Sequence, residues 1–124
     1  MTIIPVCYDL ARSSSLVEAY PGKPLYTTDE YIKRTVQLDV SPQGYLSNLK
    51  YFAEKGEFSC AVDLAGNVYV ADGEIYVFDK LGRQIDEIHV PERPATIAFG
   101  GRDGKTLFIT ARSSLYSVRP RLYP

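Results

Sequence analysis

Five acidic residues at or near the ends of predicted β-strands are the side chains of this sequence best suited to chemistry. They are Asp29, Glu30, Glu57, Asp63 and Asp72. Carboxylate oxygens of this kind hold divalent cations, and a bound cation polarises a carbonyl group and lowers the pKa of a coordinated water. The sequence alone leaves open which of the five face a common channel.

Two segments look like ion-binding or phosphate-binding loops, but a turn explains each of them better. Residues 63–67 carry oxygen side chains beside Gly66, yet they lack the later acidic ligands and the closing Glu of a calcium loop. Residues 100–106 contain Gly-Lys-Thr, but Phe99 stands where a phosphate-binding loop needs its first Gly, and a strand follows instead of a helix. We therefore predict a tight turn at each place.

The remaining nucleophilic and titratable residues form no catalytic motif. His89 is the only histidine, has no partner nearby in the sequence, and is predicted to lie on the surface. No serine stands in a Gly-x-Ser-x-Gly motif. Cys7 and Cys60 are too far apart for a metal knuckle or a redox pair, and Cys60 is expected to pack as a free thiol. The catalytic residues are therefore unknown at this stage.

The elements that must position these residues are repeated β-strands. Residues 25–29, 68–72 and 107–111 are three versions of one strand, and each is followed after a short loop by a second strand, at 35–39, 75–79 and 115–119. A period of about 40 residues built from short strands is typical of β-propeller blades. The predicted fold is all-β, a partial β-propeller of about two and a half to three four-stranded antiparallel meander blades.

We predict two regions in the chain. Residues 1–15 are a lead-in that forms an edge or a closing strand, and residues 16–124 are the partial propeller, with blades at about 16–52, 58–90 and 95–119. The first blade is expected to begin with an inner strand at 16–20. The third blade stops one strand short, and either residues 2–6 or an absent partner would supply that strand. A closed propeller has about four to eight blades, so this chain is part of a larger ring, assembles with other chains, or stays open.

Composition excludes several classes of partner. The 124 residues include 14 Lys and Arg against 15 Asp and Glu, with no long basic run, so nucleic acid is not expected as a partner. No stretch approaches the roughly 18 consecutive apolar residues of a membrane span, and the first residues do not resemble a secretory signal. We therefore predict a cytoplasmic protein with no membrane partner.

Residues 59–119 resemble the C-terminal blades of the gluconolactonase, regucalcin and luciferin-regenerating enzyme family. The stretches that carry the likeness are 61–71, 90–94, 99–111 and 114–116, in the expected order and spacing. The resemblance implies a six-bladed β-propeller that hydrolyses lactones with one divalent cation, usually Ca²⁺, at the mouth of the channel. It also implies cation ligands that comprise a Glu, two amide-type residues and an Asp.

Few of the ligand positions that the resemblance implies are present. The position of the family's ligand Asp is occupied by Phe58 and is followed by Ser59, and an amide ligand falls near Ser14 and Ser15. The other ligands belong to blades that this chain does not contain. Glu57 is the one metal candidate left, through a shift of one residue, although such a shift turns a side chain to the opposite face of a strand.

These observations favour a partial member of a metal-dependent lactone hydrolase family. The expected parent activity is hydrolysis of a sugar lactone or related ester, and the chain alone is expected to be inactive, with Ca²⁺ as the cofactor of the parent family or no cofactor in this chain. The expected partners are a small-molecule lactone or ester and either further copies of the chain or the missing blades. The alternative function is a non-catalytic propeller-blade interaction module that assembles with itself.

Overall fold

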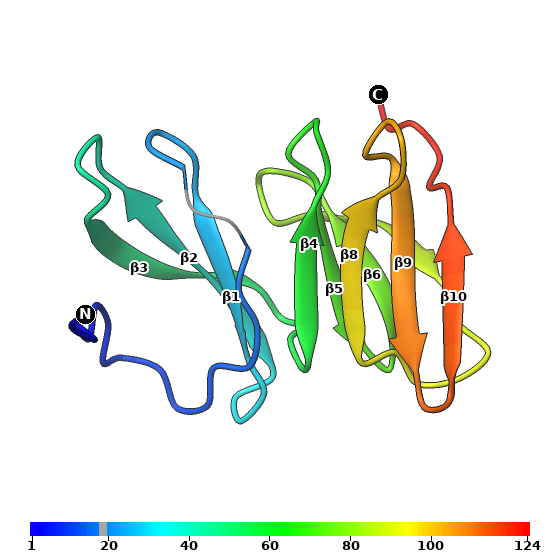
Figure 1. Ribbon diagram of the computed structural model, residues 1–124, viewed down its shortest axis with the longest axis horizontal. Helices are drawn as coiled ribbons and strands as arrows, with labels where there is room; N and C mark the ends of the chain where they lie inside the picture. The colour runs from blue at the N-terminus through cyan, green and yellow to red at the C-terminus, as the bar shows by residue number, and fades with distance from the viewer. Residues whose placement is uncertain (18–19) are drawn as a thin grey trace.

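The protein is built from antiparallel β-sheets that stand side by side (Figure 1). The computed structural model describes residues 1–17 and 20–124, and these residues contain ten strands and no helix. The strands are β1 (Leu25–Asp29), β2 (Arg34–Val40), β3 (Leu46–Ala53), β4 (Ser59–Val62), β5 (Val68–Asp72), β6 (Glu74–Phe78), β7 (Gln84–Ile88), β8 (Thr96–Gly100), β9 (Thr106–Ala111) and β10 (Ser114–Val118). The predicted all-β repeat fold is confirmed.

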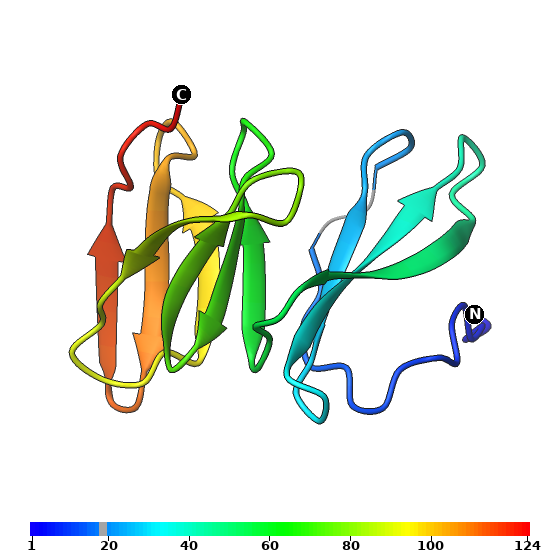
Figure 2. The ribbon, with the colours of Figure 1, turned by 180° about the vertical axis from the view of Figure 1, so that it is seen from behind.

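Each sheet is a meander in which strands that are consecutive in the chain pair with one another. The first sheet has the order β1-β2-β3, the second β4-β5-β6-β7 and the third β8-β9-β10. Seen from both sides, the second and third sheets stack face to face, and β4 lies beside both β1 and β8 (Figures 1 and 2). This arrangement is a partial β-propeller.

Alternation along the strands explains why the sheets stack. In β5, Val68 and Val70 face the first sheet, whereas Tyr69 and Ala71 face the third, and all four side chains are at most 1% exposed. A strand that is buried on both faces has a continuous run of apolar residues in its sequence, as residues 68–71 do. The second sheet is therefore the centre of the molecule, with one apolar core on each side of it.

The predicted turn at residues 63–67 is confirmed. The Oδ1 atom of Asp63 accepts hydrogen bonds from the backbone amides of Ala65 and Asn67, at 3.0 and 2.8 Å. Gly66 has a φ of +91°, a region that glycine adopts at little cost. The segment between β8 and β9 is likewise a turn that leads into a strand, as expected for residues 100–106.

The edge of the first sheet differs from the prediction. Residues 12–17 run beside β1, with a bridge between Ser13 and Asp29 and a hydrogen bond of 3.0 Å from the Ser14 amide to the Thr28 carbonyl. The segment beside β1 therefore begins earlier than the predicted strand at 16–20, of which residues 18–19 lie outside the described part of the chain.

Residues 2–6 do not complete the third sheet, so the first of the two alternatives for its missing strand is wrong. The N-terminal segment lies against the first sheet, at the end of the molecule opposite to β10 (Figure 1). The physical reason is an apolar face on the first sheet, formed by Leu25, Val36, Leu38 and Val40, on which Cys7 and Leu10 pack. This face has no neighbouring sheet, and the N-terminal segment partly removes it from water.

The third sheet has three strands within the described residues, and the C-terminal tail follows them. The Tyr123 hydroxyl donates a hydrogen bond of 2.8 Å to Asp86 on β7, and the Tyr123 ring packs against the core between the second and third sheets. Arg121 pairs with the same carboxylate at 3.1 Å. The tail therefore fastens the third sheet to the second.

Candidate functional site

Four of the five acidic candidates lie at one end of the sheets, at the lower edge of Figure 1. The strands alternate in direction, which brings the loops β1–β2, β3–β4 and β7–β8 and the turn β5–β6 to this end. The acidic residues there are Asp29, Glu30, Glu57 and Asp72. Asp63 is at the opposite end, in the turn between β4 and β5. We call the first of these two ends the Glu57 end.

Three of the four acidic residues at the Glu57 end hold the backbone or another side chain. The Asp29 carboxylate is buried and accepts hydrogen bonds from the amides of Ala11 and Arg12, at 2.7 and 3.0 Å. Glu30 pairs with the Arg12 guanidinium at 2.8 Å. Asp72 accepts a hydrogen bond of 3.0 Å from the Gly56 amide. These carboxylates stabilise the loops.

Glu57 is the most deeply buried charged side chain of this group that has charged partners, with 2% of its surface exposed. Its Oε2 atom lies 2.8 Å from the Lys33 ammonium and also accepts a short hydrogen bond from Arg93. The Arg93 Nε–H donates a second hydrogen bond, of 3.0 Å, to Oε1. These three residues form the Glu57 cluster. Lys33 lies in the β1–β2 loop, Glu57 in the β3–β4 loop that joins the first sheet to the second, and Arg93 in the β7–β8 loop that joins the second sheet to the third.

The charges of the cluster keep Glu57 ionised. Burial by itself would raise the pKa of Glu57, but the hydrogen bonds and charges of Lys33 and Arg93 outweigh burial and lower the pKa below its ordinary value of 4.5. A carboxylate with a lowered pKa is a weak proton acceptor near neutral pH. The cluster is therefore poorly suited to general-base chemistry.

The chain reaches this position because a glycine precedes Glu57. A Cβ atom on Gly56 would lie 2.2 Å from the Arg34 carbonyl oxygen, so no larger residue fits without movement of the backbone. The Ser14 hydroxyl donates a hydrogen bond to the Glu57 carbonyl on the other side. Both contacts cross between sheets or strands that are distant in the sequence, and together they fix the loop that carries Glu57.

The residues present do not fit a divalent cation at Glu57. Ca²⁺ takes six to eight oxygen ligands, whereas both carboxylate oxygens of Glu57 face positively charged side chains. Among the described residues, no group of three or more His, Cys, Asp or Glu side chains could hold a metal ion. Lys33 and Arg93 therefore neutralise the Glu57 carboxylate, in the place that a divalent cation would take.

The positions at which the resemblance implies ligands have other roles. Phe58 is 41% exposed. The Arg93 Cζ atom lies over its ring, 6.0 Å from the ring centroid. The Ser59 hydroxyl accepts a hydrogen bond of 3.1 Å from the Ile97 amide and so joins β4 to β8. The Ser15 hydroxyl lies 2.9 Å from that of Thr28. These side chains link strands to one another.

Sequence reasoning missed the cations of the cluster and the partner of His89. Lys33 and Arg93 are separated from Glu57 by 24 and 36 residues, and no local pattern pairs them. His89 lies on the surface as predicted, and its Nδ1 atom is 2.6 Å from the Glu74 carboxylate. Glu74 is 15 residues away in the chain, and the pairing of β6 with β7 brings the two together.

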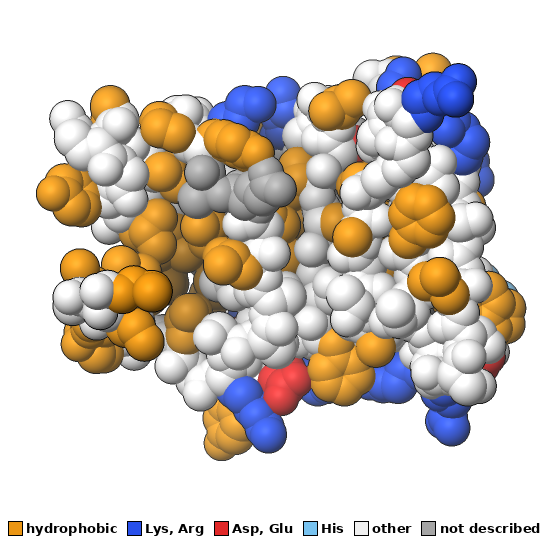
Figure 3. Space-filling view, in the orientation of Figure 1, with side chains coloured by type: hydrophobic (Ala, Val, Ile, Leu, Met, Phe, Trp, Pro, Cys, Tyr) orange, Lys and Arg blue, Asp and Glu red, His pale blue; other side chains and the backbone are white. Residues whose placement is uncertain are grey.

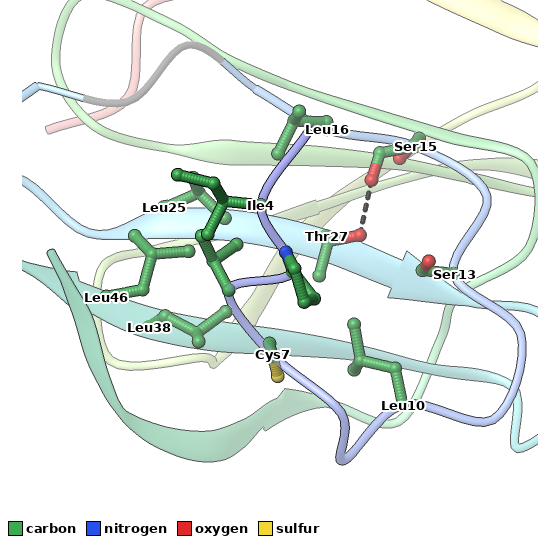
Figure 4. A pocket seen from close by; sticks show the side chains of 12 residues that line it. Ile4, Cys7, Leu10, Ser13, Ser15, Leu16, Leu25, Thr27, Leu38 and Leu46 are labelled. Carbon is green, nitrogen blue, oxygen red and sulfur yellow. Dashed lines mark hydrogen bonds between the residues drawn. The ribbon is translucent and has the colours of Figure 1, made fainter. Parts of the chain in front are cut away.

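An apolar pocket of about 340 Å³ lies away from these charged residues, between the N-terminal segment and the first sheet. Figure 4 shows Ile4, Cys7 and Leu10 on one side and the leucines of β1–β3 on the other. Among the described residues, its lining contains apolar side chains and hydroxyl groups but no charged side chain. The pocket is thus an apolar hollow that is separate from the Glu57 cluster.

The two cysteines are free thiols in different surroundings. Cys7 is half-buried in the wall of this pocket, whereas Cys60 is buried on β4. Burial raises the pKa of Cys60 to about 11, and a hydrogen bond with Ser15 opposes that shift. A thiol with so high a pKa is protonated at neutral pH and is a poor nucleophile. Cys60 is thus a packing residue.

Comparison with known proteins was made by sequence and by fold. The family model described as "SMP-30/Gluconolactonase/LRE-like region" matches residues 20–113. A comparison with curated proteins gives no match. In addition, no described segment forms a helix that is long and apolar enough to cross a membrane.

Several solved structures have the same fold. A candidate gluconolactonase is similar with a TM-score of 0.80 and 20% sequence identity, over 92% of this chain and 40% of that one. A gluconolactonase from Xanthomonas campestris gives 0.78 and 22%, over 89% of this chain and 38% of that one. Regucalcin from Agrobacterium tumefaciens, a calcium-binding protein, gives 0.69 and 18%, over 82% and 38%. The chain spans about two fifths of the length of these structures.

Proposed function

The chain belongs to the SMP-30/gluconolactonase/LRE-like family, and from this premise we propose that it is part of a lactone-hydrolysing propeller. The parent activity is the hydrolysis of a sugar lactone or a related ester, and the chain by itself does not catalyse it. The substrate of the complete propeller is a small lactone or ester, and Ca²⁺ is the cofactor of the parent family.

The observation that carries the proposal is that Lys33 and Arg93 form ion pairs with Glu57. Hydrolysis of an ester needs a group that polarises the carbonyl and a base or metal-bound hydroxide that supplies the nucleophile. The Glu57 cluster has positive charge for the first task, but its carboxylate is ion-paired and has a lowered pKa. The other carboxylates at this end bind backbone amides or Arg12, and no group among the described residues could hold a metal ion, so we infer that this chain does not supply the nucleophile.

Two further facts support a partial propeller. The chain matches about two fifths of each of the solved structures, so ligands contributed by other blades are outside it. The regucalcin of similar fold is a calcium-binding protein. We propose that any divalent cation of the complete ring is held by residues outside this chain, because those present here do not fit it.

The proposal is tested by hydrolysis of glucono-lactone with the purified chain, with Ca²⁺, Mn²⁺ or Zn²⁺ added in turn. We expect no rate above that of buffer containing the same metal, and no saturable metal binding by titration calorimetry. A metal-dependent rate that the E57Q variant lacks would overturn the proposal, because it would make Glu57 part of an active site. The E30Q variant serves as the matched control, since Glu30 lies at the same end and pairs with an Arg12 side chain that is 70% exposed.

A further inference from the structure

The outward face of the third sheet is bare. Six side chains of β8, β9 and β10 point away from the second sheet and are exposed, namely Thr96, Ala98, Phe108, Thr110, Leu115 and Ser117. We call these residues the open face. Leu115 is 70% exposed and Phe108 39%. None of the six is charged, and Figure 3 shows uncharged and apolar side chains over these strands, with charged ones near the two ends.

In the other two sheets, the residues equivalent to those of the open face are buried against a neighbouring sheet. Alignment of the strands places Phe108 at the position of Tyr69, and Leu115 at the position of Ile75. In the second sheet, Tyr69 and Ile75 are at most 1% exposed and lie in the core against the third sheet. In the first sheet the corresponding Tyr26 is buried against the second sheet. Within the described part of the chain, only the third occurrence of this surface has no sheet against it.

The same chain also carries the matching surface. We call the face of a sheet that packs on the sheet before it in the chain the receiving face. On the third sheet this face is apolar, and its Ile97, Leu107 and Ile109 pack against the second sheet. On the first sheet the equivalent face is covered only by residues from the N-terminal segment, as far as the described residues show. That cover is incomplete, because it leaves the pocket of about 340 Å³ beneath it (Figure 4).

The N-terminal cover is itself weakly anchored. Met1, Ile3, Ile4, Val6 and Tyr8 are 66–127% exposed, and Figure 3 shows apolar side chains gathered on the surface at the left, where the N-terminal segment lies in Figure 1. Among the hydrogen bonds of the described residues, those that anchor this segment to β1 include the bonds from the Ala11 and Arg12 amides to the Asp29 carboxylate. Residues 1–10 could therefore leave the first sheet while residues 11–17 stay beside β1.

We propose that the open face docks on the first sheet of a second copy of this chain, and that residues 1–10 are displaced from that sheet. Two copies with three sheets each make a ring of six, in which both open faces and both receiving faces are buried. A two-fold axis along the channel closes the ring, so the association stops at two copies. The new contact continues the sheet-on-sheet packing seen between the second and third sheets. This inference goes beyond the proposed function and names a different partner. A ring of two copies contains only the residues of this chain, and the described ones do not fit a divalent cation, so it is an alternative to completion of the ring by other blades.

The proposal is tested by sedimentation of the purified chain over a wide concentration range. We expect a dimer with twice the mass of the chain. Removal of residues 1–9 should tighten the dimer by about tenfold, because the cover then no longer competes for the receiving face. L115D should weaken the dimer by at least about tenfold, since it places a charge in an apolar interface.

The matched control is L64D, because Leu64 is 82% exposed and lies in the turn between β4 and β5, outside the open face. L64D should leave the dimer unchanged, and circular dichroism should show both variants folded. The proposal is overturned if the full chain and the shortened chain are both monomers, or if they form trimers or open polymers. It is also overturned if L115D and L64D dissociate the dimer equally. A monomer would overturn this inference and leave the proposed function standing, whereas a dimer would mean that the ring closes without the other blades on which the proposed function depends.

Discussion

Replacement of Glu57 by Gln is the sharpest test of how the three sheets are held together at the Glu57 end. The substitution keeps the shape of the side chain and removes its negative charge, so Lys33 and Arg93 face each other without a counter-charge. The three hydrogen bonds to Glu57 come from charged donors. Bonds of this kind contribute about 1.5–3 kcal/mol each.

The expected loss is smaller than the sum of these bonds. Lys33 and Arg93 are 56% and 52% exposed, so both regain contact with water when the carboxylate is lost. Breaking a fully buried ion pair costs about 3–5 kcal/mol. We therefore expect E57Q to lower the free energy of unfolding by about 2 kcal/mol, which corresponds to a decrease in Tm of roughly 8 °C at about 4 °C per kcal/mol.

The loss of stability in E57Q should decrease as the pH falls. The pKa of Glu57 is lower in the folded protein than its ordinary value of 4.5, so the folded state binds the proton more weakly than the unfolded state does. The ion pairs therefore stabilise the protein fully above about pH 4.5, and this contribution is lost as the pH falls through the folded-state pKa. The difference between wild type and E57Q should be largest near neutral pH and should shrink in acid.

Urea unfolding followed by circular dichroism, at pH 7 and at several acidic values, measures both quantities. E30Q is the control, because Glu30 pairs with an Arg12 side chain that is 70% exposed, and such surface pairs contribute less than about 1 kcal/mol. Two results would refute this reasoning. One is an E57Q variant as stable as wild type at pH 7, and the other is a Ca²⁺-dependent rise in Tm that wild type shows and E57Q lacks.

Three further predictions follow from single contacts. G56A should lower the free energy of unfolding by about 2 kcal/mol or more in urea unfolding, because its Cβ would lie 2.2 Å from the Arg34 carbonyl oxygen; a neutral result would contradict the tight packing described. I75A should cost about 2–5 kcal/mol in the same assay, since Ile75 is fully buried between the second and third sheets. R119M should raise the pKa of Asp103, which the hydrogen bonds of Arg119 lower to about 2, towards 3.8 in an NMR titration; an unchanged pKa would rule out this pair in solution.

The strands and turns could be predicted because their signals are local. Alternation of apolar residues in β5 and β6, and the Asp and Gly of the turn at residues 63–67, place the second sheet to within one or two residues. Prediction was weaker in the first sheet, where the segment beside β1 lies at residues 12–17 and makes few regular hydrogen bonds. No periodicity marks such an irregular edge.

The candidate site was only partly predictable. Sequence reasoning grouped Asp29, Glu30, Glu57, Asp63 and Asp72 as residues at strand ends, and it named Glu57 as the metal candidate. The structure places Asp63 at the opposite end from the other four. It did not predict that Lys33 and Arg93 bind Glu57, because these contacts join three loops that are 24 and 36 residues apart in the chain. The role of a carboxylate depends on what surrounds it, and a neighbouring cation changes a metal ligand into half of an ion pair.

The sequence by itself determined the repeat, the pairing of consecutive strands as antiparallel meanders, and the family. Each of these depends on residues that are close together in the chain. The tertiary structure alone decided which charges meet and which apolar faces are covered. Stacking of the sheets brings Glu57 between Lys33 and Arg93, and it leaves Leu115 exposed where the equivalent Ile75 is buried. Both outcomes depend on the neighbour that each sheet has, and that information is not contained in any one repeat.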